Sequence, residues 1–337
     1  GARPTGGALS AGSGRTRGGV LVPALLFLPL SLLAVAAEAP LSFDDPDTHV
    51  VLLGTGTPNA TPDRQGPALA IVSGGRPYLV DCGTGVVRRA VEAGIRVEEL
   101  SRAFVTHLHS DHTLGYPDLI LTPGVLGRTE PLQVYGPKGL RAMTERIVEA
   151  WREDREVRLH GGEPSNPASY EVRPVEIRPG EVYRDGNVRV VAFPVSHGAW
   201  GEAFGYRFEA RDKVIVVSGD TTWDERMVGY AAGADILVHE VYCEAGWWNR
   251  TPEWRAYHAR YHTSGPDLGC LAARVRPRTL VLTHQLLMGA PREALLAEIR
   301  RVWVRYPDLR LAQLLVNLIR PPDPCPQVFY FEDTELL

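Results

Sequence analysis

Residues 106–119 read THLHSDHTLGYPDL, and they place three histidines and an aspartate within six positions of a chain that has 10 histidines in all. His107 and His109 are two residues apart, and Asp111 directly precedes His112. On a helix, side chains two residues apart point to different faces, whereas a tight loop after a strand lets them face one centre. The stretch therefore predicts a metal-binding loop.

The donor types narrow the choice of metal. Imidazole nitrogens and carboxylate oxygens suit Zn²⁺, Mn²⁺ or Fe²⁺, and the absence of thiolates from the cluster argues against a structural zinc site. Four groups on so short a loop do not fit around one ion without strain, so we expect two neighbouring ions. A carboxylate that bridges both ions would hold them roughly 3.5–4 Å apart.

The remaining ligands are expected where later strands end. Strand ends converge on one edge of a layered sheet, so residues far apart in the sequence can meet there. Five strand-like apolar runs end in histidine or aspartate, at His107, His197, Asp220, His239 and His284.

These positions divide into two ligand sets. His197 completes one set with His107 and His109, and His284 completes the other with Asp111 and His112. Asp220, in the sequence SGDT, is the expected bridge. Water held between two such ions loses a proton near neutral pH and becomes a nucleophile, so the pattern predicts a hydrolase that acts through a metal-bridging hydroxide.

The order of these motifs resembles the metallo-β-lactamase superfamily from about His49 to Trp303. The resemblance is carried by LLGTGTPN (52–59), YLVDCGTG (78–85), THLHSDHTLG (106–115), VSHG (195–198), SGDT (218–221), VHE (238–240) and LTHQ (282–285). It implies an α+β fold, a four-layer αββα sandwich with a dinuclear metal site at the sheet edge. The metal ligands that it implies are His107, His109, Asp111, His112, His197, Asp220 and His284.

Within that superfamily, YGPKGL (135–140), HEVY (239–242) and YHTS (261–264) look most like ribonuclease Z and its phosphodiesterase and arylsulfatase-like relatives. In ribonuclease Z a glutamate orients a histidine that protonates the leaving oxygen. The matching residues here are Glu240 and His262, and the resemblance gives Asp111 the role of orienting or deprotonating the water. General acid–base groups of this kind suit the cleavage of a phosphodiester.

Two departures argue against a tRNA-processing enzyme. Ribonuclease Z enzymes commonly carry a long arm between the positions of His197 and Asp220, which here are 23 residues apart, enough only for a hairpin. The cationic loop near the N-terminus of that family is replaced by TPDRQGPA (61–68), whose one cation is Arg64.

Three alternatives to a small-substrate phosphodiesterase stay open. A true 3′-tRNA-processing endoribonuclease predicts a basic groove that runs from the metal edge. An arylsulfatase-like or lactonase-type esterase predicts a closed aromatic pocket around Trp247 and Trp248. A non-catalytic metal-binding protein would bind metal and be inert.

Several other residues have both a functional and an ordinary interpretation. Asp81 is either a hydrogen-bonding partner of a ligand histidine or a turn residue. His239 either faces the substrate or is a core histidine satisfied by the backbone. The aromatic residues are expected to overhang the site, as a substrate wall or as a dimer contact: Trp247, Trp248, Trp254, Tyr257 and Tyr261.

The N-terminus predicts export. Arg15 and Arg17 precede an uncharged apolar run, and Ala-x-Ala patterns follow at 34–36 and 37–39, so residues 1–39 resemble a signal peptide, with an uncleaved anchor as the alternative. We expect a periplasmic or secreted protein with no stable membrane partner after cleavage, and a possible homodimer. Residues 40–337 are expected to form one hydrolase domain. A net charge of −4 gives no strong basic field that would point to nucleic acid.

Overall fold

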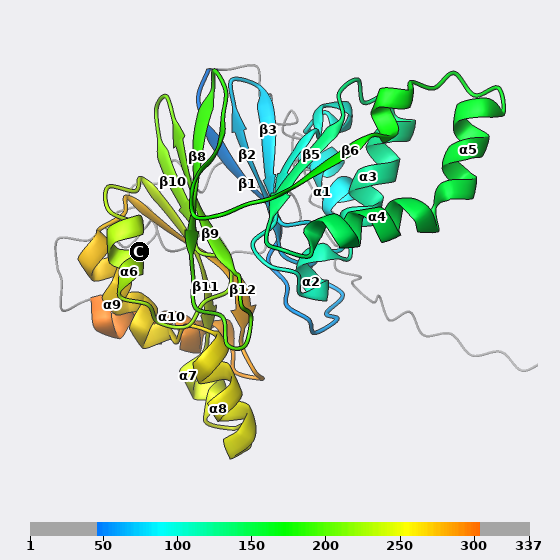
Figure 1. The fold of residues 1–337 in the computed structure, drawn as a ribbon. Helices are drawn as coiled ribbons and strands as arrows, with labels where there is room; N and C mark the ends of the chain where they lie inside the picture. Colours follow the sequence, from blue (N-terminus) through cyan, green and yellow to red (C-terminus); the bar gives the residue numbers. More distant parts are fainter. Residues whose placement is uncertain (1–45, 304–337) are drawn as a thin grey trace, which may run out of the picture. The chain divides into compact units, whose positions relative to one another are not determined.

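The computed structural model describes residues 46–303 (Figure 1). The predicted leader at 1–39 and Cys325 lie outside the described residues, whereas Cys82, Cys243 and Cys270 are free thiols. Within residues 46–303, no helix has the length and apolar character needed to cross a membrane.

The first sheet begins with antiparallel strands and continues with parallel ones. Its first three strands pair antiparallel, and its last four pair parallel. In spatial order the strands are β1 (His49–Gly54), β2 (Ala68–Ser73), β3 (Arg76–Val80), β4 (Arg102–Phe104), β5 (Leu132–Gly136) and β6 (Val172–Glu176).

The second sheet repeats this order along the chain, with antiparallel strands before parallel ones. Its first four strands form an antiparallel meander, and its last three pair parallel. The strands, again neighbours in this order, are β7 (Gly180–Arg184), β8 (Val188–Pro194), β9 (Phe204–Ala210), β10 (Val214–Val217), β11 (Ile236–Tyr242) and β12 (Thr279–Leu286).

Each half of the chain also contains helices. In the first half they are α1 (Val86–Glu92), α2 (Ser110–Thr113), α3 (Tyr116–Val125), α4 (Leu140–Ala150), α5 (Arg152–His160) and the 3₁₀ turns η1 (Val97–Glu99) and η2 (Pro167–Tyr170). In the second half they are α6 (Arg226–Tyr230), α7 (Glu244–Trp247), α8 (Pro252–Tyr261), α9 (Gly265–Val275) and α10 (Arg292–Trp303).

Three hydrophobic clusters show that the elements form four layers. Every residue of β2 is buried, because alternate side chains face opposite sides and both sides are covered. Ala70 packs outward under α1, α3 and α4, whereas Ile71 packs between the two sheets. On the other side, α6, α9 and α10 cover the second sheet. The predicted αββα sandwich is confirmed.

The predicted strand ends need two corrections. His107, His197 and Asp220 lie three residues beyond β4, β8 and β10, as an edge site requires. However, β11 and β12 do not end at their histidines, because their parallel pairing continues to Tyr242 and Leu286. His239 and His284 therefore lie inside strands.

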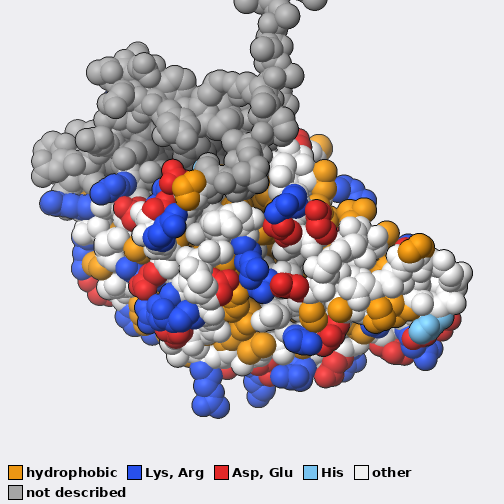
Figure 2. Space-filling view, turned by 90° about the horizontal axis from the view of Figure 1, so that it is seen from above, with side chains coloured by type: hydrophobic (Ala, Val, Ile, Leu, Met, Phe, Trp, Pro, Cys, Tyr) orange, Lys and Arg blue, Asp and Glu red, His pale blue; other side chains and the backbone are white. Residues whose placement is uncertain are grey.

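Charges are mixed on the face of the molecule that lies at the top of Figure 1. In that view, Lys and Arg side chains alternate with Asp and Glu side chains rather than gathering into a field of one sign (Figure 2).

Candidate metal centre

The first predicted ligand set comes together at the edge of the sandwich. His107 Nε2 lies 2.8 Å from His109 Nδ1, and His197 Nε2 lies 3.2 Å from the same nitrogen. One donor atom from each of these histidines and one from Asp220 all lie within 4.8 Å of one another. The loop after β4 and the loop after β8 thus present three imidazole nitrogens to one point.

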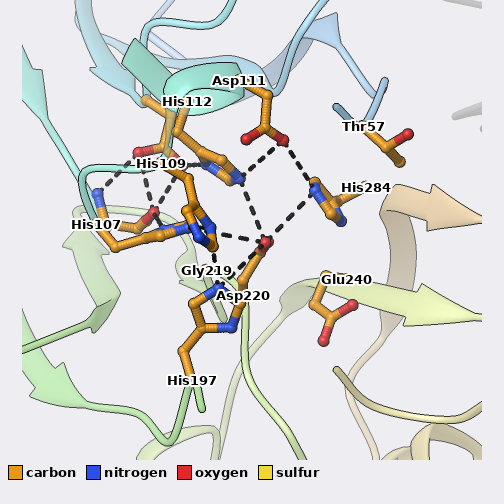
Figure 3. Close-up of polar contacts among 12 residues, drawn as sticks. Thr57, His107, His109, Asp111, His112, His197, Gly219, Asp220, Glu240 and His284 are labelled. Carbon is orange, nitrogen blue, oxygen red and sulfur yellow. Dashed lines mark hydrogen bonds and ion pairs between the residues drawn. The ribbon is translucent and has the colours of Figure 1, made fainter. Parts of the chain in front are cut away.

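The second set lies beside the first and shares Asp220 with it. Donor atoms of Asp111, His112 and His284 lie within 4.8 Å of one another. Asp220 Oδ2 is 3.4 Å from the Nε2 atoms of both His112 and His284, and 3.9 Å from those of His107 and His197 (Figure 3). The carboxylate that the sequence predicts as a bridge lies between the two sets.

Hydrogen bonds fix the direction of the imidazoles. Asp81 Oδ2 lies 2.7 Å from His112 Nδ1, so this nitrogen carries the proton because a carboxylate only accepts. The hydroxyl of Thr106 donates to Asp81, and its oxygen lies 3.0 Å from His107 Nδ1. This oxygen can therefore accept a hydrogen bond from the N–H at His107 Nδ1. His197 Nδ1 donates to the carbonyl of Tyr261 at 2.8 Å. In all three histidines the Nε2 lone pair is left for the centre.

Backbone geometry places two of the central residues. His284 is the extra residue of a β-bulge in β12, because Glu240 pairs with Thr283 and Val241 with Gln285. Its φ of 43° is unusual for a residue with a side chain, and the bulge turns its ring toward the centre. Gly219 has a φ of 63°, and a Cβ there would lie 2.7 Å from the carbonyl oxygen of Phe204. The turn that presents Asp220 therefore requires glycine.

The electrostatics of the cluster favour a cation. Burial lowers the pKa of His107 well below its ordinary value and that of His197 to about 4, so both rings are neutral. Burial opposes the charge on Asp220, but the imidazoles of His284 and His112 hold its pKa well below the ordinary value. Buried lone pairs and a buried negative charge therefore share one site.

A buried imidazole nitrogen without a hydrogen-bond partner also favours a cation at this site. His112 Nε2 is buried and has no hydrogen-bond partner among the described residues. Burial alone would lower the pKa of His112, but the carboxylates of Asp220 and Asp81 raise it well above its ordinary value, so positive charge is favoured there. The donor set of nitrogen and oxygen, its closeness and this orphaned nitrogen fit a divalent metal.

Glu240 and His262 are neighbours, as the resemblance implies. His262 Nδ1 lies 3.3 Å from Glu240 Oε2, but neither atom forms an aligned hydrogen bond among the described residues. Glu240 Oε1 accepts from the main-chain N–H of Thr263 at 2.8 Å. Burial and the charge of Asp220 raise the pKa of Glu240 well above its ordinary value, whereas burial lowers that of His262 to about 4.

The structure also clarifies the positions of His239 and His262. His239 is a core histidine, because it is buried in β11 and its Nδ1 lies 2.6 Å from the carbonyl of Glu240. His262 also lies where it can bind a metal, since one of its nitrogens lies within 4.8 Å of donor atoms of Asp220 and His284.

Sequence reasoning also missed Trp200. Its indole Nε1 donates to His109 Nε2 at 2.9 Å, and the two rings are 4.9 Å apart. The only signal was its position three residues after His197, in a loop that already carries a ligand.

Comparison with known proteins agrees with this architecture. Residues 76–285 match the family model described as a beta-lactamase superfamily domain. Proteins named Ribonuclease Z are 34% identical over 240 residues in Mycobacterium marinum and 35% identical over 247 residues in Mycobacterium sp. (strain KMS). These matches cover 70% and 72% of this chain and 85% and 86% of the relatives.

Solved structures agree on the fold. Human tRNase Z, short form, is 23% identical with a TM-score of 0.59, over 71% of this chain and 93% of that one. The metallo-beta-lactamase fold protein YhfI from Bacillus subtilis is 17% identical with a TM-score of 0.58, over 76% of this chain and 94% of that one. The chain belongs to the beta-lactamase superfamily, as a ribonuclease Z-like, metal-dependent hydrolase of the metallo-β-lactamase fold.

Proposed function

We propose that this chain holds two zinc ions and hydrolyses a phosphodiester or a related anionic ester. The observation that carries the proposal is the position of Asp220 Oδ2, between the His107/His109/His197 set and the Asp111/His112/His284 set. When bound, two Zn²⁺ ions act as Lewis acids toward water and toward the anionic ester. Mn²⁺ and Fe²⁺ suit the same donors.

The protein's own groups supply the proton transfers. Asp111 Oδ2 lies 3.1 Å from His284 Nε2, and although burial opposes its charge, this hydrogen bond lowers the pKa of Asp111 below the ordinary value. Asp111 therefore stays ionised and can orient the attacking water or take its proton. On the other side of Asp220, Glu240 and His262 together hold a proton that His262 can pass to the leaving oxygen.

A second candidate function is 3′-tRNA processing, because the relatives with 34% and 35% identity are named Ribonuclease Z. The geometry favours a smaller or more flexible substrate. Between His197 and Asp220 the structure contains only the β9–β10 hairpin, which is part of the second sheet and leaves no arm for a large RNA. An arylsulfatase-like or lactonase-type activity is the third candidate, which the aromatic residues near the centre favour.

The test compares three substrates on the chain from Leu41 onward, with metal content measured on the same sample. The substrates are bis(p-nitrophenyl) phosphate, p-nitrophenyl sulfate and a precursor tRNA. Asp220→Ala should abolish phosphodiester hydrolysis and lower the bound metal, whereas Asp154→Ala, on the surface helix α5, should change neither. Clean 3′ cleavage of the tRNA would favour the second candidate, and turnover of the sulfate alone would favour the third.

Export and dimerisation are separate proposals. The apolar run and the Ala-x-Ala patterns support cleavage of residues 1–39 during export, and exposed aromatic side chains on α8 are compatible with a contact between two copies. Expression of the full chain, followed by fractionation and mass measurement of the mature protein, tests the first. Sedimentation of the purified protein tests the second.

A further inference from the structure

Helix α8 is unusual because it is aromatic and yet wholly at the surface. None of its residues from Pro252 to Tyr261 is buried. Trp254 and Tyr257 are 55% and 36% exposed, and Trp248, in the preceding turn, is 59% exposed. Single exposed aromatics are common, but a group of them usually marks a binding surface. We call Trp248, Trp254, Tyr257, His258 and Tyr261 the aromatic ridge.

The rings of the ridge lead to the metal centre in two rows. Trp254 and His258 are stacked with centroids 5.6 Å apart, and His258 is 5.9 Å from His262. His262 in turn is stacked on His284 at 5.4 Å. Trp254 and His258 are four residues apart on α8, so they share one face of the helix, and His262 directly follows its last residue.

In the second row, Tyr257 is stacked on Tyr261 at 4.3 Å, and the Tyr261 ring is 5.1 Å from that of His197. Each row thus begins at an exposed ring and ends at a predicted metal ligand. A flat group bound on the ridge would lie within a few ring spacings of the scissile bond.

The ridge is held rigidly. The carbonyl of Tyr261 accepts from His197 Nδ1, and its hydroxyl accepts from the main-chain N–H of Ala199 at 3.1 Å. A Cβ at Gly198 would lie 2.0 Å from the Tyr261 ring, so the ring packs directly on the backbone beside a ligand. The hydroxyl of Thr222 also donates to the carbonyl of Ala259 at 2.8 Å. A fixed platform loses little entropy when a ligand stacks on it.

Charge indicates what this platform binds. Arg250, Arg255 and Arg260 are in the ridge segment, against one acidic residue, Glu253. The Arg255 guanidinium lies 5.1 Å from the centre of the Trp248 ring. Aromatic rings interleaved with cations are the arrangement that binds single-stranded nucleic acid, because bases stack on the rings and phosphates pair with the cations.

The size of the ridge argues against a second copy of this chain as the occupant. A stable protein–protein interface buries about 800 Å² on each partner. A helix of ten residues is only about 15 Å long, so the ridge alone is too small for such an interface.

We propose that the aromatic ridge binds the unpaired bases of a single-stranded nucleic acid and directs the adjoining phosphodiester to the metal centre. The assignment of this phosphodiester to the centre rests on the proposed function, whereas stacking on the ridge does not require catalysis. The ridge therefore selects a phosphodiester that carries flat bases.

The experiment measures binding without turnover. Fluorescence anisotropy follows a labelled hexacytidylate and an abasic phosphodiester chain of the same length, on the full chain with chelator present. Trp254→Ala should weaken binding of the hexacytidylate about fivefold to a hundredfold, Trp254→Phe should restore most of it, and the abasic chain should respond to neither. Trp151→Ala is the matched control, because Trp151 is also exposed, at 41%, and lies between α4 and α5.

The outcomes separate the two proposals. Equal binding of the hexacytidylate by wild type and Trp254→Ala, or no binding by the wild type at millimolar protein, would overturn the ridge assignment. A loss of self-association in Trp254→Ala, with binding unchanged, would show a contact between copies instead. Failure of metal-loaded protein to hydrolyse bis(p-nitrophenyl) phosphate, with base-dependent binding intact, would overturn the proposed function and leave the ridge in place. Thermal unfolding of each variant confirms that it is folded.

Discussion

Replacing Asp81 by asparagine would measure how much the centre depends on a carboxylate that lies behind a ligand. Asp81 accepts from the main-chain N–H of Thr106 at 2.8 Å, from its hydroxyl at 2.9 Å and from His112 Nδ1 at 2.7 Å. Asparagine keeps the size of the side chain and tolerates the φ of 61° at this position. Its NH₂ group, however, cannot accept a hydrogen bond.

The expected effect is larger on metal binding than on folding. Without the Asp81 carboxylate to accept from Nδ1, a neutral His112 can carry its proton on Nε2, the atom that faces Asp220. A proton on Nε2 occupies the lone pair that a metal would bind. Loss of such a partner typically lowers metal affinity about 10- to 100-fold, which corresponds to about 1.4–2.7 kcal/mol. Loss of a charged hydrogen bond should also lower the free energy of unfolding by about 1.5–3 kcal/mol.

The assay is a zinc titration against a chelator of known affinity, with urea unfolding of the metal-free protein in parallel. Asp185→Asn is the matched control, because Asp185 accepts from the hydroxyls of Tyr78 and Tyr183 at 2.6 and 2.9 Å, away from the centre. Both variants should lose stability, but only Asp81→Asn should lose zinc affinity. Unchanged zinc affinity in Asp81→Asn would refute the role we assign to this carboxylate.

Four further predictions follow from single contacts. Arg128→Met should lower the free energy of unfolding in urea by at least about 3 kcal/mol, because the buried guanidinium donates to four main-chain carbonyls; a loss below 1 kcal/mol would contradict this. Gly198→Ala should impair folding or hydrolysis, since its Cβ would overlap the Tyr261 ring at a φ of 58°, and a fully active variant would be unexpected. Zinc titration of the metal-free protein should change tryptophan fluorescence, and Trp200→Phe should remove most of that change. Although burial opposes the charge on Asp212, hydrogen bonds lower its pKa below 3.8, so its stabilisation is present above about pH 4 and lost as the pH falls; unfolding measured from pH 6 to pH 3 should depend less on pH in Asp212→Asn.

Much of the architecture follows from local sequence. Apolar runs bounded by glycine predict the strands, whereas the layered αββα arrangement is implied by the resemblance of the motif order to the metallo-β-lactamase superfamily. The metal-binding loop is also local, since His107, His109, Asp111 and His112 lie in the loop after β4 and in the short helix α2 that follows it. The distant ligands could be predicted because His197 and Asp220 lie three residues beyond strands that end at the same edge.

Other features could not be predicted because they depend on pairing between distant segments. The sequence indicates that His239 and His284 both lie at strand ends, but the strands continue past both. A bulge then turns His284 toward the centre, whereas regular pairing leaves His239 in the core. Two histidines in similar sequences thus have opposite roles, and the difference is one unpaired residue in the register of β11 and β12.

The sequence by itself determined which residue types can bind metal and the order in which they reach the edge of the sandwich. Only the tertiary structure decided which nitrogen of each imidazole faces the centre, because that choice depends on Asp81, Thr106 and Tyr261, acceptors supplied by other segments. The same holds for α8, whose aromatic spacing is visible in the sequence but whose exposure depends on what packs against it. A side chain's chemistry is local, but its direction and its burial are set by contacts across the fold.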